Sequence, residues 1–171
     1  IIFDDRIFDK IVNTKCDIGI ALDQNWKRNY ISRTHHPKSM ADLVETKNGR
    51  IIKIRKNLQE KNTSEFIGIL KFSSMGWKIL INLCQELKKN HKGVFHNANS
   101  FSVAYITDIV QELVNLDYDV KPIFVQGDWL EIDTLVAVSG KVDTKRGEAN
   151  LLVSSIDRDL RVVEVADDQV A

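Results

Sequence analysis

The fold is decided by one stretch, residues 120–134, which reads VKPIFVQGDWLEIDT. Its first part is mostly apolar and predicts a strand at residues 120–125. The acidic run that follows contains Glu131 and Asp133, and side chains two apart on an extended backbone point to the same face. Two carboxylates at a strand end form an oxygen-rich site of the kind that Mg²⁺ prefers. The alternative interpretation is a solvated strand end, because charged side chains are mostly exposed.

The composition is that of a globular chain large enough for one domain with a sizeable core. Of its 171 residues, 43% are hydrophobic and 28% are charged. Lys+Arg and Asp+Glu both number 24, so no overall charge favours nucleic acid or an anionic membrane. No apolar run approaches the roughly 20 residues that span a bilayer. We therefore expect neither nucleic acid nor membrane as a partner.

The cysteines and the first residues of the sequence indicate the redox compartment of the protein and the presence of an upstream part. Cys16 and Cys84 lie far apart, which predicts buried thiols in a reducing compartment, the cytoplasm, rather than a disulfide or a zinc site. The chain begins on Ile1-Ile2-Phe3 rather than on Met, and these residues are typical of a strand end. We therefore expect an upstream part that this chain does not contain.

Strand and helix patterns alternate along the chain, which predicts an α/β domain with a mainly parallel sheet. Asn48-Gly49 is a strong hairpin signal, and the hairpin would make that sheet mixed. In such sheets ligands bind beyond the carboxyl ends of the strands, where the acidic run would lie. Strands are expected at residues 17–22, 41–46, 50–55, 65–72 and 120–125. Helices are expected after the capping residues Asp4 and Asp5, at 77–87 and at about 102–116.

Two other places carry candidate site residues, each with a plain alternative. Glu65 precedes Gly68 in a predicted strand, where a glycine marks either the close approach of a ligand or simple packing. Tyr105 and Asp108 are three apart on one face of a predicted helix, where they could reach a substrate together or lie on the helix surface. No Gly-rich phosphate loop is present, so a nucleotide loop would have to lie upstream.

In their order and spacing, these segments resemble the nucleotidyltransferases of the nucleotide-diphospho-sugar transferase fold. They look most like the cytidylyltransferase-like branch of phosphonate and phosphocholine pathways, which is sometimes fused to phosphoenolpyruvate phosphomutase. The resemblance covers roughly residues 1–136 and implies a three-layer, Rossmann-like α/β fold. It rests on HP at 36–37, ADLV at 41–44, NGRI at 48–51, EFIGILKF at 65–72, YITD at 105–108, QEL at 111–113 and WLEIDT at 129–134.

The resemblance implies Mg²⁺-dependent transfer of a nucleotidyl group, CMP from CTP, with release of pyrophosphate. The acceptor would be a phosphonate, phosphocholine or a sugar phosphate. Mg²⁺ would neutralise phosphate charge and orient the α-phosphoryl group, since this catalysis is mostly positioning and electrostatics. By the family pattern, Glu131 and Asp133 would hold the metal, Glu65, Gly68, Tyr105 and Asp108 would line the acceptor pocket, and Trp129 would pack beside it. A homodimer and a fusion to a phosphomutase domain are both compatible with the resemblance.

The chain also departs from the family pattern. The Gly-rich nucleotide loop and a second metal aspartate would lie upstream of Ile1, and Leu43 stands where many relatives carry a lysine. We therefore interpret residues 1–136 as the C-terminal part of the transferase domain, and expect this chain alone to be inactive. Residues 137–171 form an atypical tail of short strands without an assigned role.

Two other functions remain open from the sequence. One is a non-catalytic module that keeps the transferase fold and binds a sugar phosphate or nucleotide. The other is a nucleic-acid-binding role for basic residues of the tail, which the lack of aromatic residues there for base stacking disfavours.

Overall fold

The computed structural model describes residues 1–31, 37–130, 137–143 and 150–157. By its internal contacts the chain divides into two compact units, Ile1–Leu130 and Glu131–Ala171. The first unit holds the main sheet and the helices of the described chain. Within the described residues, no helix is both long and apolar enough to cross a membrane.

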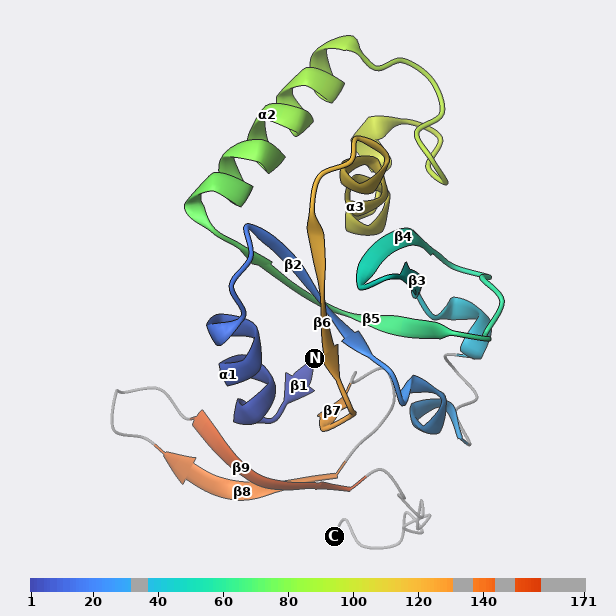
Figure 1. The fold of residues 1–171 in the computed structure, drawn as a ribbon. Coiled ribbons are helices and arrows are strands. Elements are labelled where there is room, and N and C mark those ends of the chain that lie inside the picture. The colour runs from blue at the N-terminus through green and yellow to red at the C-terminus, as the bar shows by residue number, and fades with distance from the viewer. Residues whose placement is uncertain (32–36, 131–136, 144–149, 158–171) are drawn as a thin grey trace, which may run out of the picture. The chain divides into compact units, whose positions relative to one another are not determined.

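A five-stranded sheet forms the centre of the first unit, in the order β4-β3-β5-β2-β6 (Figure 1). Only β2 and β6 pair in parallel, and the other three neighbouring pairs of this sheet are antiparallel. The sequence-based expectation of a mainly parallel sheet was therefore wrong, although the α/β class and the mixed sheet are confirmed. The strands are β2 (Ile18–Asp23), β3 (Leu43–Lys47), β4 (Arg50–Arg55), β5 (Thr63–Phe72) and β6 (Val120–Val125).

The antiparallel pairing of β3 with β4 follows from the short connection between them. A parallel pair needs a crossover of a dozen or more residues, usually a helix, whereas a short turn reverses the chain. Asn48 and Gly49 have φ angles of 52° and 74° and make a two-residue turn between β3 and β4, as the sequence predicted. Pro122 cannot donate a ladder hydrogen bond, and it lies in β6, an edge strand of this sheet.

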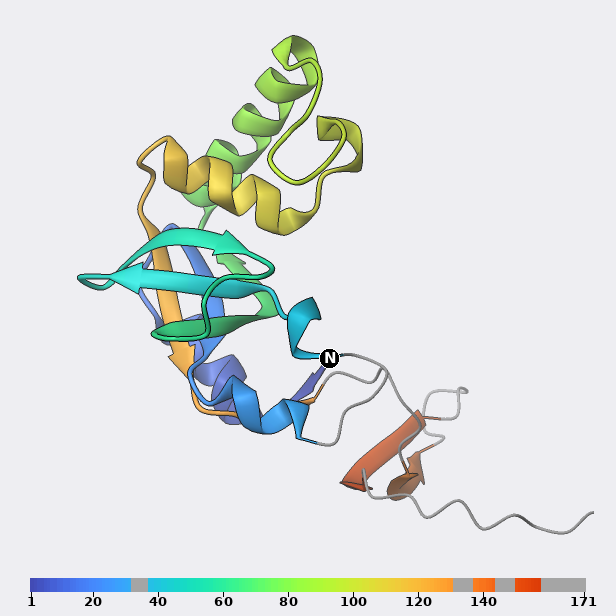
Figure 2. The ribbon, with the colours of Figure 1, turned by 90° about the vertical axis from the view of Figure 1, so that its right-hand side faces the viewer.

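Three helices cover the two faces of the sheet in a three-layer arrangement. α2 (Ser74–Asn90) and α3 (Ile106–Asn115) lie on one face, and α1 (Asp5–Asn13) lies on the other (Figures 1 and 2). The first turn of α1 is capped by the Asp4 carboxylate, which accepts a hydrogen bond from Arg6 N at 2.9 Å. At the start of α2, Ser73 Oγ accepts hydrogen bonds from the next backbone N–H groups in the same way.

Successive residues of β2 contribute to two separate cores. Ile20 and Leu22 pack towards α2 and α3, in the cluster that includes Leu113. Ala21 packs towards α1, with Ile7 and Ile11. Every residue of β2 is buried, which explains why this strand is a continuous apolar run in the sequence rather than an alternating one.

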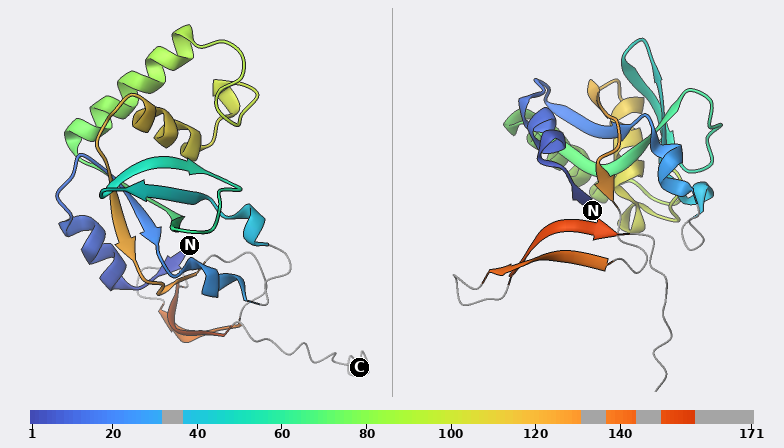
Figure 3. Two further views of the ribbon diagram at one scale, coloured as in Figure 1. Left: turned by 45° about the vertical axis from the view of Figure 1, so that its right-hand side comes forward. Right: turned by 90° about the horizontal axis from the view of Figure 1, so that it is seen from below.

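The first residues of the chain lie beside the segment that leads to the acidic run. β1 (Ile2–Phe3) pairs antiparallel with β7 (Trp129–Leu130), so that Phe3 faces Trp129 in the register. Figure 3 shows that β2 and β6 end at the same edge of the sheet, next to β7. This edge is the carboxyl end of the parallel strand pair.

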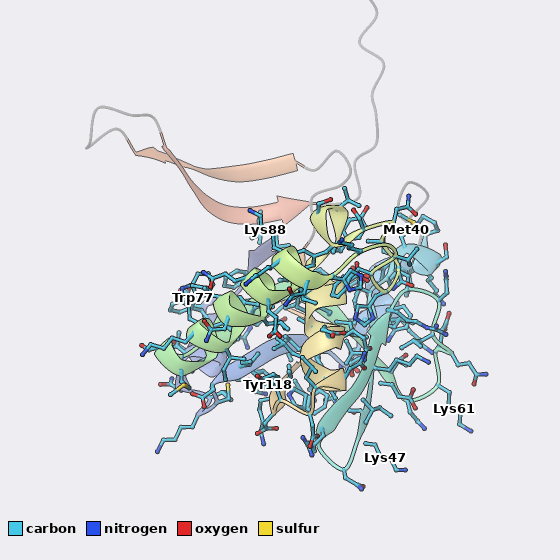
Figure 4. All side chains as sticks on the ribbon, turned by 90° about the horizontal axis from the view of Figure 1, so that it is seen from above. Met40, Lys47, Lys61, Trp77, Lys88 and Tyr118 are labelled. Atoms are coloured by element: carbon cyan, nitrogen blue, oxygen red, sulfur yellow. The ribbon has the colours of Figure 1, made fainter. Side chains whose placement is uncertain are left out.

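Short helical turns and surface side chains complete the first unit. The turns are η1 (Trp26–Tyr30), η2 (Lys38–Met40) and η3 (Phe101–Val103). Figure 4 marks the exposed side chains of Trp77 on α2 and Tyr118 after α3. In the second unit, β8 (Ala137–Asp143) and β9 (Asn150–Asp157) form an antiparallel pair.

Candidate active site at the carboxyl end of the sheet

The turn between β6 and β7 brings the chain to the first residue of the acidic pair. Gly127 and Asp128 have φ angles of 79° and 62°, which reverse the chain after β6. Leu130 then pairs with Ile2, and the described segment ends there. Glu131 and Asp133 lie outside the described residues, so their assignment as metal ligands stays a prediction.

Asp23, the last residue of β2, holds this turn in place. Its side chain is completely buried, at 0% exposure. Its Oδ1 accepts a hydrogen bond from Gly127 N at 3.1 Å, and its Oδ2 accepts one from Trp129 Nε1 at 2.8 Å. The same carboxylate accepts hydrogen bonds from Asn25 N at 2.8 Å and Asn29 Nδ2 at 3.3 Å. One side chain therefore joins the loop after β2 to the turn after β6.

The sequence analysis missed Asp23. An aspartate directly after an apolar strand, at an edge where ligands bind, was nevertheless a usable signal. Burial of a carboxylate requires that its oxygens accept hydrogen bonds. The donors Gly127 and Trp129 are 104 and 106 residues away, so the sequence alone did not reveal them.

Glu65 lies beside Asp23 on the neighbouring strand. The two residues are register partners in the antiparallel pair of β2 and β5, and directly opposed residues of such a pair share one face of the sheet. Glu65 is 4% exposed, and its Oε1 accepts a hydrogen bond from the Tyr30 hydroxyl. Glu65 and Trp129, both predicted from the sequence as substrate-binding residues, are thus each next to Asp23.

Gly68 lies farther along β5, at an irregularity in the sheet. The register between β2 and β5 shifts between Ile20 and Leu22, opposite this part of β5. Gly68 has a φ angle of 79°, and a Cβ atom there would approach Ile1 Cδ1 to 2.7 Å. A bulge explains the glycine without a ligand, and its predicted place in an acceptor pocket is not tested.

Tyr105 and Asp108 form the start of α3. Asp108 is 2% exposed, and its Oδ2 accepts a hydrogen bond from Tyr105 N at 3.0 Å. Its Oδ1 accepts two from Asn97, both at 3.3 Å. Tyr105 is 71% exposed, and Lys56 Nζ lies 5.9 Å from the centroid of its ring. The structure therefore gives Asp108 a capping role, while substrate binding by either residue stays a prediction.

A polar cavity of about 330 Å³ opens between the loops at one end of the sheet. Its wall includes Gln24, Thr46 and Thr63, and the Thr63 hydroxyl is buried without a hydrogen-bond partner. Lys27 and Glu60 also contribute, and their charged groups pair at 3.1 Å. The hydrogen bond from Lys27 holds the pKa of the Glu60 carboxyl below its usual value. None of the substrate-binding residues predicted from the sequence lines this cavity.

Metal binding is not decided by the described part of the chain. Residues 1–31, 37–130, 137–143 and 150–157 contain no group of three or more His, Cys, Asp or Glu residues arranged to hold a metal ion. The predicted pair of Glu131 and Asp133 is outside these ranges. Mg²⁺ accordingly remains a prediction.

The fold and this edge define an α/β protein with a polar site where two parallel strands end. No family model matches the chain. A CTP:phosphoglutamine cytidylyltransferase of Campylobacter jejuni is 26% identical to it over 126 residues, which are 72% of this chain. The chain spans about half the length of that protein, 49%. This similarity supports a cytidylyltransferase-like family.

Proposed function

We propose that this chain is part of a cytidylyltransferase that transfers CMP from CTP to a small phosphate or phosphonate acceptor. The observation that carries the proposal is the similarity to a cytidylyltransferase over 126 residues of the chain. Phosphonates, phosphocholine and sugar phosphates are the acceptor classes that we propose, and the name of the relative adds phosphoglutamine.

The reaction joins an acceptor oxygen to the α-phosphorus of CTP. As that bond forms, the bond from the α-phosphorus to the oxygen bridging to the β-phosphate breaks. Its electron pair leaves with pyrophosphate. The protein contributes mainly by holding the two reactants in line and by stabilising the charge on the phosphates.

Glu131 and Asp133 are the proposed holders of Mg²⁺. Their carboxylate oxygens are the ligand type that Mg²⁺ prefers, and in the sequence they directly follow β7. When bound, the ion would supply charge neutralisation at the phosphates. The chain's own part would be to supply these two carboxylates as ligands.

Glu65, Gly68 and Trp129 are proposed to lie on the acceptor side of the site. Support comes from the burial of Glu65 against Tyr30 and of Trp129 against Asp23, because side chains held in this way present a rigid wall. The exposed Tyr105 ring is available to a ligand, and Asp108 fixes the backbone of Tyr105.

A non-catalytic binding module is the second candidate. The polar cavity of about 330 Å³ favours it, because the volume is within the range of small-molecule sites and its wall contains none of the predicted site residues. Such a module would bind its ligand with Glu131 and Asp133 removed, whereas the transferase would lose turnover.

The deciding experiment uses the protein expressed from its full open reading frame. Pyrophosphate release from CTP and Mg²⁺ is measured against phosphonates, phosphocholine, phosphoglutamine and sugar phosphates, with Asp133→Ala as the control variant. Turnover that Asp133→Ala abolishes supports the transferase and identifies the acceptor. Binding without turnover that is unchanged by Asp133→Ala would refute it in favour of the binding module.

A further inference from the structure

The polar cavity of about 330 Å³ in the first unit has no part in the proposed transfer reaction. Its wall is built from the loop after β2, from β3 and β6, and from the segment that leads into β5. None of the predicted substrate-binding residues lines it. The chemistry of this wall therefore has to be explained separately.

Four residues of the wall have polar side chains that are left for a ligand. Gln24 and Asn62 have amides, and Thr46 and Ser64 have hydroxyls. Within the described part of the chain, none of these four side chains makes a hydrogen bond to another protein group. Amide and hydroxyl side chains can both donate and accept hydrogen bonds, so the wall offers both kinds of group.

The two charged residues of the wall neutralise each other. Lys27 Nζ lies 3.1 Å from Glu60 Oε2, and Lys38 Nζ, which is not part of the wall, lies 3.9 Å from the same oxygen. The hydrogen bond from Lys27 lowers the pKa of the Glu60 carboxyl, which keeps this group ionised at neutral pH. An anionic ligand would therefore meet Glu60, and a cationic ligand would compete with the two lysines.

A neutral ligand that both donates and accepts hydrogen bonds matches this wall best. A hydroxyl does both, whereas a phosphate or carboxylate only accepts and an ammonium only donates. An apolar ligand would bury the amides and hydroxyls without partners, which is unfavourable. The cavity volume lies at the lower end of the range of about 300–1,000 Å³ for small-molecule sites, which suits a single ring.

Trp26 holds two parts of the wall together. It is 1% exposed, and its Nε1 donates a hydrogen bond to Thr63 O at 3.2 Å. Its ring packs edge-on against Tyr30, with the ring centroids 5.7 Å apart. The loop after β2 is thus tied to the first residue of β5, and a ligand that binds between them loses little affinity to rearrangement of the wall. The half-buried ring of Phe124 adds an apolar surface to the same wall.

We propose that this cavity binds an uncharged, hydroxyl-rich ring of about the size of one sugar unit, through the side chains of Gln24, Thr46, Asn62 and Ser64. The inference does not rest on nucleotidyl transfer. It gives a ligand class to the cavity that favours the binding module, and in a transferase the cavity would be a second site.

Binding is measured by ligand-observed NMR titration of the protein from its full open reading frame, without CTP or Mg²⁺. The uncharged probes are methyl α-D-glucopyranoside and N-acetylglucosamine, each at up to about 10 mM. Glucose 1-phosphate is the charged counterpart. We expect saturable binding of at least one uncharged sugar, and no binding by either of them would overturn the inference.

Asn62→Ala tests whether the sugar binds in this cavity, with Asn57→Ala as the matched control. Both asparagines are exposed and lie between β4 and β5 with φ angles of 62° and 60°, so alanine adds similar backbone strain at both. Only Asn62 lines the cavity. Loss of one neutral hydrogen bond should weaken sugar binding about three- to tenfold in Asn62→Ala, and Asn57→Ala should bind as the wild type does.

A second matched pair covers the opposite part of the wall. Gln24→Ala should weaken sugar binding by a similar factor, whereas Gln59→Ala should not, because Gln59 is exposed and does not line the cavity. Sugar binding that is unchanged in both Asn62→Ala and Gln24→Ala would overturn the inference. Tighter binding of glucose 1-phosphate than of the uncharged sugars, if Asn62→Ala weakens it, would also overturn it, because the cavity would then prefer an anion.

Glu60→Gln tests the charge argument directly. This change leaves Lys27 and Lys38 without their shared carboxylate. Because all three groups are partly exposed and screened by water, we expect a modest gain of about threefold in the affinity for glucose 1-phosphate relative to methyl α-D-glucopyranoside. An unchanged ratio would show that Glu60 does not shield the lysines, and would overturn the assignment of an uncharged ligand.

The binding assay and the pyrophosphate assay separate failure of the inference from failure of the proposed function. A protein that releases pyrophosphate but binds neither uncharged sugar rejects the inference alone. A protein that binds sugar in the cavity without turnover on any acceptor rejects the transferase alone. Sugar binding that requires CTP and Mg²⁺ would assign the cavity to the transfer reaction, and would overturn the inference of an independent site.

Discussion

Asp23 and Asp108 are buried to 0% and 2% exposure, and both accept hydrogen bonds from N–H groups through both carboxylate oxygens. The donors of Asp108 are 3 and 11 residues away along the chain. Two donors of Asp23 are 104 and 106 residues away. Asp108 thus organises one helix start, whereas Asp23 joins the ends of two strands.

The surroundings of the donors also differ. Gly127, Trp129 and Asn29 are buried, so their N–H groups cannot turn to water when Asp23 is removed. Tyr105, directly before α3, and Asn97, in the loop that precedes η3, are exposed. A buried donor without a partner costs more than one that water can reach, so the two aspartates should differ in their contribution to stability.

The largest expected effect is the difference between Asp23→Ala and Asp108→Ala. Asp23→Ala should lower the free energy of unfolding by about 3 kcal/mol, because it leaves several buried donors unpaired. Asp108→Ala should cost about 1 kcal/mol, as expected for the loss of a helix cap. Urea denaturation of both variants measures the difference, and equal losses would show that the Asp23 contacts contribute no more than a local cap.

Substitution of Gly127 should have the next largest effect. Gly127→Ala places a methyl group in a left-handed backbone and against Arg28, and we expect a loss of about 2 kcal/mol. Gly93→Ala is the matched control, since Gly93 has a φ angle of 86° and no atom within 4 Å of an added Cβ. It should cost only about 1 kcal/mol from backbone strain.

The excess cost of Gly127→Ala should arise from Arg28. Adding Arg28→Ala to Gly127→Ala removes the clash, and the measured loss should then approach that of Gly93→Ala. If the double variant is no more stable than Gly127→Ala, the close approach of the guanidinium does not contribute to the cost.

Asn29 and Asn97 allow a smaller and closely matched test. Each donates from Nδ2 to one of the two aspartates at 3.3 Å, but Asn29 is 9% exposed and Asn97 is an exposed residue. Asn29→Ala should cost about 1 kcal/mol and Asn97→Ala about 0.5 kcal/mol, because water replaces only the exposed contact. Thermal unfolding of the pair checks this order, and the reverse order would contradict the comparison.

The contrast between local and long-range contacts also explains which parts of the fold could be predicted from the sequence. The helix and strand positions were predictable because their apolar residues repeat at clear periods, as in α2 and in β6. The orientation of the strands was not, since it depends on how β2, β5 and β6 are connected and paired. The alternation of strand and helix segments was interpreted as a series of helical crossovers between parallel strands. In the structure, most neighbouring strands of the sheet run antiparallel.

Glu65 and Trp129 were expected at the site from the family resemblance. The structure places both next to Asp23, and their roles stay predictions. Asp108 and Tyr105 were identified by a spacing of three residues, which a substrate site and a helix cap share. Asp23 was missed because its long-range donors leave no trace in the sequence around it. Glu131 and Asp133 lie outside the described residues and stay predictions.

The smallest expected effect uses the two cysteines as reporters for the two sides of the sheet. Cys16 packs with the cluster under α1, which also contains Trp129, a hydrogen-bond partner of Asp23, and Cys84 packs with the cluster under α2 and α3. Burial raises the pKa of both thiols above the usual value. Less thiolate is therefore present at a given pH, and alkylation of the wild type near pH 8 should be slower than that of a free thiol.

Alkylation rates in the two aspartate variants then report which side opens. Asp23→Ala should accelerate Cys16 by a few-fold with little change at Cys84, and Asp108→Ala should do the reverse, because loosening of a cluster exposes the thiol that packs against it. Cys84→Ser and Cys16→Ser backgrounds isolate each reaction for mass spectrometry. Equal acceleration of both thiols in both variants would mean that each aspartate acts only on global unfolding, and the distinction between a strand junction and a helix cap would then have no local consequence.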